Sequence, residues 1–418
     1  MSTLRKGGGI YTYMKEYIIS LTGKDSHRVM IPAGQGSFSI GTKGLSEGEY
    51  DVWVEPDSVI NWDAFNEFLT GYSNKEDCPY GNWPRWFYYS GNDTGFIEWS
   101  KRREIEQFQW FPHTSMRVDL TDANITHLCI YVQPHAQGKK LPASTATDYK
   151  FEIIVGGTIR KLTLAGALEN FEIIKCDKMP YMEFTPDYPK ENIVCQLPVF
   201  PVLAQASALC IYNNPAKAAF DCESLLQFQH LRDISLYGNM TNLNALAKLE
   251  QLEGIALRYV PSLEGMPALH IWEGLTSLIG YNIEETAGKA LRAELRQMKK
   301  ERQMTEYSGV SQLRKRVWFE TEYGIPFSEW EEKIAKKATR AYKSCFKQIK
   351  KSQTEGEVQA AVTEFIQKIN RLDGIETTER EDVFTAVLQL KEGLDKECLS
   401  VKISPEKWEQ WFDEIREF

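Results

Sequence analysis

The stretches LRDISLYGN (231–239) and LEGIALRYV (252–260) carry apolar residues at the same offsets. The first, fourth and sixth positions are apolar in both: Leu231, Ile234 and Leu236 in one, Leu252, Ile255 and Leu257 in the other. Alternate side chains of a strand point to opposite faces, so the fourth and sixth positions share one face. The two stretches therefore predict two similar short strands, each with one buried face.

Further stretches follow the same pattern with irregular spacing. They are 125–130, 159–164, 168–176 (LENFEIIKC), 206–214 (ASALCIYNN) and 275–280, with a weaker fit at 179–184. One strand of this kind cannot cover its own apolar face, so the units are expected to stack. Between two of them, Leu243, Leu246 and Leu249 recur at intervals of three, which predicts a short helical or 3₁₀ return segment.

The pattern L-x-x-L-x-L-x-x-N/C resembles that of leucine-rich-repeat proteins. Cys176, Asn214 and Asn239 occupy its last position. The resemblance covers roughly residues 120–285 and is clearest over 206–283. It implies a solenoid of stacked parallel strands joined by short returns. The alternative is an ordinary α/β domain with a coincidental leucine spacing.

In such a strand the third, fifth and seventh positions point away from the core, onto the concave face. The seventh position is a tyrosine or an arginine in four successive units. These residue types are enriched at the energetic centres of protein interfaces. The resemblance implies partner binding through this face, and we predict a site made of Tyr212, Asp233, Ser235, Tyr237, Arg258 and Tyr281. The alternative is aromatic stacking that only stabilises the sheet.

The composition of the chain changes on both sides of this region. Residues 1–118 combine short strand-like runs and glycine-rich turns with tryptophans at 53, 62, 83, 86, 99 and 110, which we interpret as core residues. From about residue 286 the periodicity is that of amphipathic helices. We predict an α+β multidomain protein: a Trp-rich, β-containing N-terminal domain (1–118), a leucine-rich-repeat-like solenoid (119–285) and an α-helical C-terminal domain (286–418).

The charge of the chain is −9, with an uneven distribution. Residues 286–351 hold 17 basic and 8 acidic residues, whereas residues 352–418 hold 8 basic and 16 acidic ones. We expect these two halves to pair with each other, and a docking surface for an acidic partner or nucleic acid is the alternative. The net negative charge argues against general affinity for nucleic acid or for anionic membranes.

Several classes of site and location are disfavoured by the sequence. The eight cysteines show no CxxC or zinc-finger spacing, so we read them as reduced core residues and expect neither metal nor cofactor. The chain has no apolar run of about 18 residues and no secretory signal. We therefore expect a cytoplasmic protein without a membrane span.

No catalytic constellation emerges from the sequence. His127 and Cys129 lie two apart on a predicted strand, but a Cys–His pair needs an exposed thiol and an orienting group. We predict a non-enzymatic protein that binds another protein. The layout is similar to bacterial leucine-rich-repeat proteins of the toxin-immunity kind, which makes a basic toxin the specific candidate partner.

One enzymatic alternative shares this layout. It is a leucine-rich-repeat effector that carries a helical, ubiquitin-ligase-like catalytic domain with a Cys-x-Asp nucleophile. The cysteines of the helical region, Cys345 and Cys398, both lack that aspartate. The oligomeric state is not predicted.

Overall fold

The computed structural model describes residues 14–32, 36–42, 50–66, 84–132, 150–186, 194–215, 218–321, 323–373, 375, 377–396 and 403–417. The chain forms two compact units, Met1–Arg314 and Lys315–Phe418. The predicted domain boundaries at 118/119 and 285/286 both fall inside the first unit, and the three-part division stays a prediction. No helix within the described ranges is long and apolar enough to cross a membrane.

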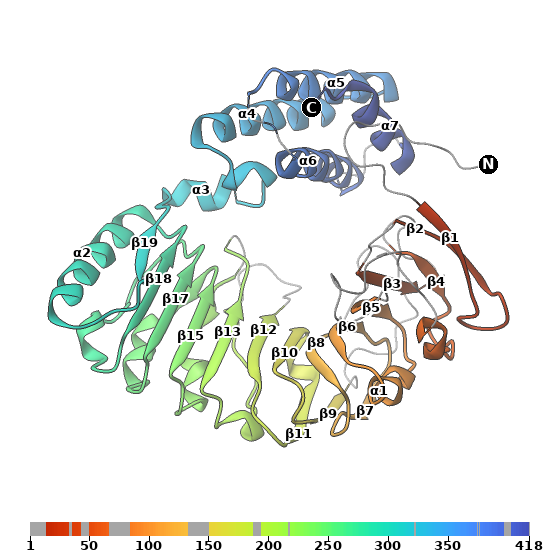
Figure 1. The fold of residues 1–418 in the computed structure, drawn as a ribbon. Helices are drawn as coiled ribbons and strands as arrows, with labels where there is room; N and C mark the ends of the chain where they lie inside the picture. The colour runs from red at the N-terminus through yellow and green to blue at the C-terminus, as the bar shows by residue number, and fades with distance from the viewer. Residues whose placement is uncertain are drawn as a thin grey trace. The chain divides into compact units, whose positions relative to one another are not determined.

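The first unit is built on a twelve-stranded sheet in which every neighbouring pair is parallel (Figure 1). Its strands, in spatial order, are β19 (Gly309–Ser311), β18 (Ser277–Tyr281), β17 (Gly254–Arg258), β15 (Asp233–Tyr237), β13 (Ala208–Tyr212), β12 (Tyr181–Pro186), β10 (Lys161–Gly166), β8 (Ile125–Val132), β6 (Ile105–Phe111), β5 (Trp86–Ser90), β3 (Ser37–Thr42) and β4 (Val52–Val54). This is the central element of an α/β fold.

Smaller elements of the first unit accompany this sheet. A parallel three-stranded sheet contains β7 (Met116–Asp119), β9 (Phe151–Val155) and β11 (Phe171–Cys176), and Figure 1 shows it with α1 (Gly95–Ser100) along one side of the large sheet. The other elements are the antiparallel pair β1 (Met14–Ile19) and β2 (His27–Pro32), the pair β14 (Phe220–Asp221) and β16 (Met240–Thr241), the helix α2 (Glu285–Glu301), and the 3₁₀ helices η1 (Trp62–Asn66), η2 (Leu168–Asn170), η3 (Pro201–Leu203), η4 (Cys222–Gln227), η5 (Leu243–Lys248) and η6 (Leu269–Ile271).

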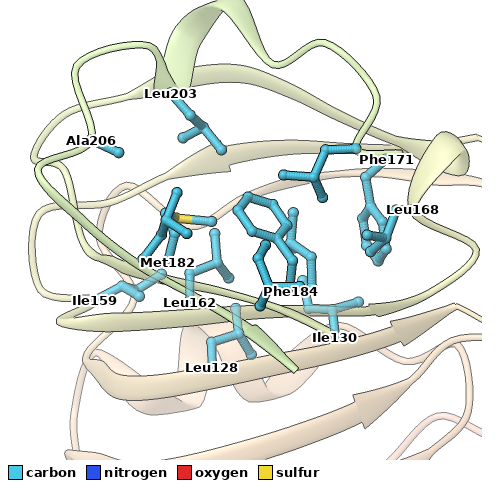
Figure 2. Close-up of a cluster of buried hydrophobic side chains, with 14 of the residues drawn as sticks. Leu128, Ile130, Ile159, Leu162, Leu168, Phe171, Met182, Phe184, Leu203 and Ala206 are labelled. Atoms are coloured by element: carbon cyan, nitrogen blue, oxygen red, sulfur yellow. The ribbon is translucent and has the colours of Figure 1, made fainter. Parts of the chain in front are cut away.

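The hydrophobic core lies on the same side as these smaller elements. Alternate residues of the strands, such as Leu162 and Leu164 of β10, are completely buried there. Figure 2 shows how β8, β10 and β12 supply side chains to this layer, which Phe171 of β11 and Leu203 of η3 cover. The alternation is the physical reason that the sheet has one apolar face and one polar face.

The predicted leucine-rich-repeat solenoid is wrong. The strands that carry the pattern form part of the twelve-stranded sheet, which continues through β6, β5, β3 and β4, beyond the residues to which the resemblance extends. Residues 168–176, taken as a unit, instead supply β11 of the separate three-stranded sheet. Apolar alternation after a turn is what any parallel strand with one buried face requires, so it identifies strands and not this family. The predicted return segment is confirmed as η5.

The tryptophans of the N-terminal region pack largely as core residues. Trp62, Trp99 and Trp110 are buried, and the Trp62 ring centroid lies within 6.1 Å of those of Phe87 and Tyr89. Trp86 differs because it lies on the polar face of the sheet and is exposed. Trp83 lies outside the described residues. The buried tryptophans therefore confirm the core interpretation for this aromatic cluster.

A polar cluster ties together the ends of three strands in the same region. The His113 Nε2 atom, just after β6, lies 3.0 Å from the Thr42 hydroxyl of β3 and 2.8 Å from the Ser90 hydroxyl of β5. Both hydroxyl residues are only 2% exposed. Burial lowers the pKa of His113, while the carboxylate of Asp57 acts in the opposite direction. These contacts join the ends of β3 and β5 to the residue that follows β6.

The second unit consists of helices around its own hydrophobic core. They are α3 (Arg316–Thr321), η7 (Pro326–Glu329), α4 (Glu332–Ile349), α5 (Glu355–Asn370), α6 (Thr377–Lys396) and α7 (Pro405–Ile415). Thr354 and Glu357 form a capping box that starts α5. Taken as a whole, the α/β fold with its large parallel sheet replaces the predicted α+β solenoid architecture.

Candidate partner-binding face

The polar face of the large sheet brings the predicted site residues together. Strand register aligns Tyr212 with Tyr237, Tyr237 with Arg258, and Arg258 with Tyr281. Asp233 and Ser235 lie on the same face of β15 as Tyr237, because alternate residues of a strand point to the same side. The six predicted residues therefore share one surface formed by four neighbouring strands, and their role in binding stays a prediction.

Four tyrosine rings form a continuous stack at one end of this face. The ring centroids are 4.2 Å apart for Tyr212 and Tyr237, 4.6 Å for Tyr237 and Tyr259, and 5.9 Å for Tyr259 and Tyr281. The first two pairs are nearly parallel, at 21° and 28°, and the last is edge-on at 72°. We call Tyr212, Tyr237, Tyr259 and Tyr281 the tyrosine stack.

Tyr259 was missed by sequence reasoning, which placed Arg258 in this row. Its backbone is left-handed, with φ of 53°. The residue that follows the strand is also left-handed after β15 and β18, where it is Gly238 and Asn282, respectively. Glycine and asparagine tolerate this conformation, whereas a bulky side chain is strained in it. An aromatic residue just after a strand, where its neighbours have Gly or Asn, is a signal that could have revealed it.

Arg258 adds a positive charge beside the stack. Its side chain is exposed and forms no ion pair with any residue that the structure describes. Its main-chain carbonyl accepts a hydrogen bond from the Gly238 N–H at 2.9 Å, which holds the strand end in place. The guanidinium is thus left available to donate hydrogen bonds to an external carboxylate or carbonyl group.

Asp233 and Ser235 have different surroundings on the same strand. Burial and the nearby carboxylate of Glu253 raise the pKa of Asp233. The Asp233 carboxylate lies over Gly254, so a side chain at position 254 would require Asp233 to shift. Ser235 is aligned with Cys210 of the neighbouring strand and acts to lower the pKa of that thiol. Both residues are therefore held by the sheet itself, and they border the tyrosine stack as a polar margin.

A second polar group occupies the middle of the face. The His127 Nε2 atom lies 3.2 Å from the Thr163 hydroxyl, which donates to Glu183 at 3.2 Å, and Lys161 pairs with Glu183 at 2.9 Å. Burial raises the pKa of the Cys129 thiol to about 12, so the thiol stays protonated near neutral pH. This arrangement does not activate Cys129 as a nucleophile, because a reactive cysteine needs a lowered pKa.

The helical cysteines give little support to a ligase-like reaction. Cys345 is 3% exposed, its thiol donates to the Ala361 carbonyl at 3.3 Å, and burial raises its pKa to about 12. Cys398 lies outside the described residues. Across the described ranges, no cluster of three or more His, Cys, Asp or Glu side chains is arranged to hold a metal ion.

Comparison with known proteins yields no matching family model, no matching characterised protein and no matching solved structure. The resemblance to leucine-rich-repeat proteins, and to their toxin-immunity kind, therefore has no support from relatives. Together with the twelve-stranded parallel sheet, this overturns it.

Proposed function

We propose that this protein binds a partner protein through the polar face of its large sheet, with the tyrosine stack and Arg258 at the centre of the contact. The observation that carries this proposal is the continuous row of rings ending at Tyr212, which is 42% exposed. Tyrosine supplies a large contact area at low entropic cost and keeps a polar tip for hydrogen bonding. Arginine and tyrosine together are typical of interface hot spots.

The geometry of the stack suggests how a partner would dock. Tyr237 and Tyr259 use their ring faces against each other and their neighbours. Tyr212 stacks on Tyr237 and is 42% exposed, so we expect a partner to reach the stack at this ring. An aromatic or proline ring of a partner could continue the stack there. Arg258 lies in the same row, on β17, which is two strands away from β13. Its guanidinium would anchor a partner carboxylate or carbonyl.

Two further properties bear on the partner and the setting. The net charge of −9 favours rapid encounter with a basic protein, because complementary charge raises association rates. The six cysteines within the described residues are free thiols, namely Cys129, Cys176, Cys195, Cys210, Cys222 and Cys345. Such thiols suit a reducing compartment, and we propose that binding takes place in the cytoplasm.

The test starts with affinity purification of the tagged full chain from its host, followed by a titration of any recovered protein in purified form. The double variant Tyr212→Ala/Arg258→Ala removes two exposed side chains without opening the core. Loss of two hot-spot contacts is expected to weaken binding by about 2 kcal/mol or more, roughly thirtyfold in Kd. The measurement is isothermal titration calorimetry.

The matched control is Tyr307→Ala, which removes a tyrosine that is 77% exposed and lies outside the stack. It is expected to leave Kd unchanged within about twofold, the spread of a neutral surface substitution. Equal Kd values for the double variant and the control would reject this face as the binding surface.

A further inference from the structure

The helix α4 has two chemically distinct faces. Ala338, Ala341, Cys345 and Ile349 are buried in the core of the second unit. The opposite side carries exposed cations at helical spacing, namely Lys333, Lys336, Lys337, Arg340, Lys343, Lys347 and Lys350. Residues three, four and seven apart lie on one side of a helix, so these charges form a single stripe. A helix of 18 residues is about 27 Å long.

Most of this stripe has no acidic partner among the described residues. Lys333, Lys337, Arg340, Lys343 and Lys347, which we call the α4 basic face, form no ion pair with residues whose positions are described. The acidic half of the unit pairs elsewhere, as Glu355 does with Lys407 at 2.6 Å and Glu364 with Lys368 at 2.6 Å. Neither of these pairs joins the α4 basic face to the acidic half, and the expectation that the two halves pair with each other stays a prediction.

We propose that the α4 basic face binds the phosphate backbone of a nucleic-acid duplex. Four of its five charges are lysines, which act as compact point charges and make phosphate contacts without reading sequence. No exposed position of α4 among the described side chains is aromatic, so the face offers little platform for stacking unpaired bases. A duplex presents about one negative charge per 1.7 Å of its axis. A straight stripe of cations can therefore contact several phosphates at once.

Other occupants fit these features less well. Protein interfaces are depleted in lysine, so a lysine stripe is an unusual contact for a protein partner. The apolar side of α4 is buried, so the helix cannot insert into a bilayer as an interfacial helix does.

The net charge of −9 does not oppose this contact strongly. Charges in solution are screened over about 8 Å at physiological ionic strength, so distant carboxylates contribute little at the α4 basic face. The local excess of 17 basic over 8 acidic residues in 286–351 agrees with a basic surface in this region. The inference does not depend on the tyrosine stack, which belongs to the other unit.

The experiment measures binding of the full chain to a fluorescent 24-base-pair duplex by anisotropy, with one DNA arm and one RNA arm, from 50 to 200 mM salt. The variant Lys337→Gln/Lys343→Gln/Lys347→Gln removes three charges of the face. The control Lys248→Gln/Lys289→Gln/Lys300→Gln removes three exposed lysines of the other unit. Circular dichroism and thermal unfolding establish that all three proteins are folded.

The wild type and the control are expected to bind at least one duplex with an affinity that falls steeply as the salt concentration rises. A plot of the logarithm of the binding constant against the logarithm of the salt concentration should have a slope of about −0.9 per phosphate contact. The α4 variant is expected to bind at least tenfold more weakly at 50 mM salt, with a slope smaller by about one per lysine in contact. Absence of duplex binding at 50 mM salt, or equal affinity of variant and control, would overturn the proposal. Binding only to vesicles of anionic lipid, measured in parallel, would overturn it in favour of a membrane surface.

Discussion

Tyr259 is the residue in which conformation and chemistry conflict most clearly. A left-handed backbone costs a residue with a side chain about 1–2 kcal/mol. Its equivalents Gly238 and Asn282 avoid much of this cost because of their residue types. The ring of Tyr259 completes the stack between Tyr237 and Tyr281. Strain of this kind persists at functional positions, where the side chain is needed for something other than stability.

This strain predicts a difference between two matched substitutions. Tyr237→Asn and Tyr259→Asn each remove a tyrosine that stacks on two neighbours. Only Tyr259→Asn also relieves a left-handed backbone, so it should destabilise the protein by about 1–2 kcal/mol less than Tyr237→Asn. The measurement is the free energy of unfolding in urea. An equal or larger loss for Tyr259→Asn would show that position 259 stores no strain.

At the residue scale, the strand pattern predicted which residues align across the sheet, but it did not identify every ring of the tyrosine stack. The seventh strand position does align Tyr212, Tyr237, Arg258 and Tyr281 across four strands. It could not show that the neighbouring Tyr259 supplies a ring to the stack, because that depends on a positive φ that a strand pattern does not encode. The exposure of Arg258 depends on tertiary neighbours in the same way.

At the scale of elements, the ends of β3, β5 and β6 are joined by the buried cluster of Thr42, Ser90 and His113. Neutral His113 suits this site because an imidazolium would be buried among hydroxyls. Its pKa is lowered from the ordinary 6.5 by burial. As the pH falls, the His113 imidazole of the unfolded chain takes up a proton near pH 6.5, whereas the folded protein takes it up only at a lower pH. Stability contributed by the neutral group is therefore lost as pH falls below about 6.5.

The corresponding prediction concerns the pH dependence of stability. The free energy of unfolding of the wild type is expected to fall between pH 7 and pH 5, and His113→Gln should show a shallower decline. The control His230→Gln changes an exposed histidine outside the cluster and should follow the wild-type profile. The measurement is urea unfolding at a series of pH values. A His113→Gln profile parallel to the wild type would remove His113 as a source of the acid sensitivity.

Element types were more predictable than element partners. The strands at 231–239 and 252–260, the short helical return and the helices α5 and α6 all follow from local periodicity. Which sheet a strand joins is decided by non-local pairing, and this is why β11 was assigned to the wrong row. The short β19 carries only one buried residue, Val310, and leaves almost no periodic signal.

At the scale of the molecule, the chain forms two units with separate hydrophobic cores. The second core is formed by apolar faces of α4, α5, α6 and α7, and Phe327 and Trp330 pack against the same cluster. The Trp330 indole N–H donates to the Asp382 carboxylate at 2.8 Å, which links the start of the unit to α6. A segment with its own core and its own polar links satisfies the physical conditions for independent folding.

We therefore expect residues 315–418 to fold when expressed alone. The fragment should show helical circular dichroism and one cooperative thermal transition, because its buried side chains come from within the unit. A fragment from 286 to 418, which begins at the domain boundary predicted from sequence, provides the comparison, since it adds α2 without the sheet that α2 packs on. A gradual, non-cooperative melt of residues 315–418 would show that the second unit needs the first.

Global quantities were the weakest guide from sequence. The net charge of −9 is a sum over the chain. The separate count of 17 basic and 8 acidic residues over 286–351 locates a basic region, but it does not show which helix face carries the charges. The repeat-like spacing suggested a family, whereas only the hydrogen-bonded order of all twelve strands shows one parallel sheet. Both properties arise from how distant segments are arranged, which a linear pattern does not determine.

The two border strands of the large sheet, β4 and β19, are its shortest, with three residues each, while all inner strands have five or more. A lateral edge exposes unpaired amide and carbonyl groups that can recruit strands from other molecules and seed fibres. Long parallel sheets are especially vulnerable because they form slowly. Because β4 and β19 are so short, each edge of this sheet offers few unpaired backbone groups. We therefore expect little tendency toward edge-to-edge association through the large sheet.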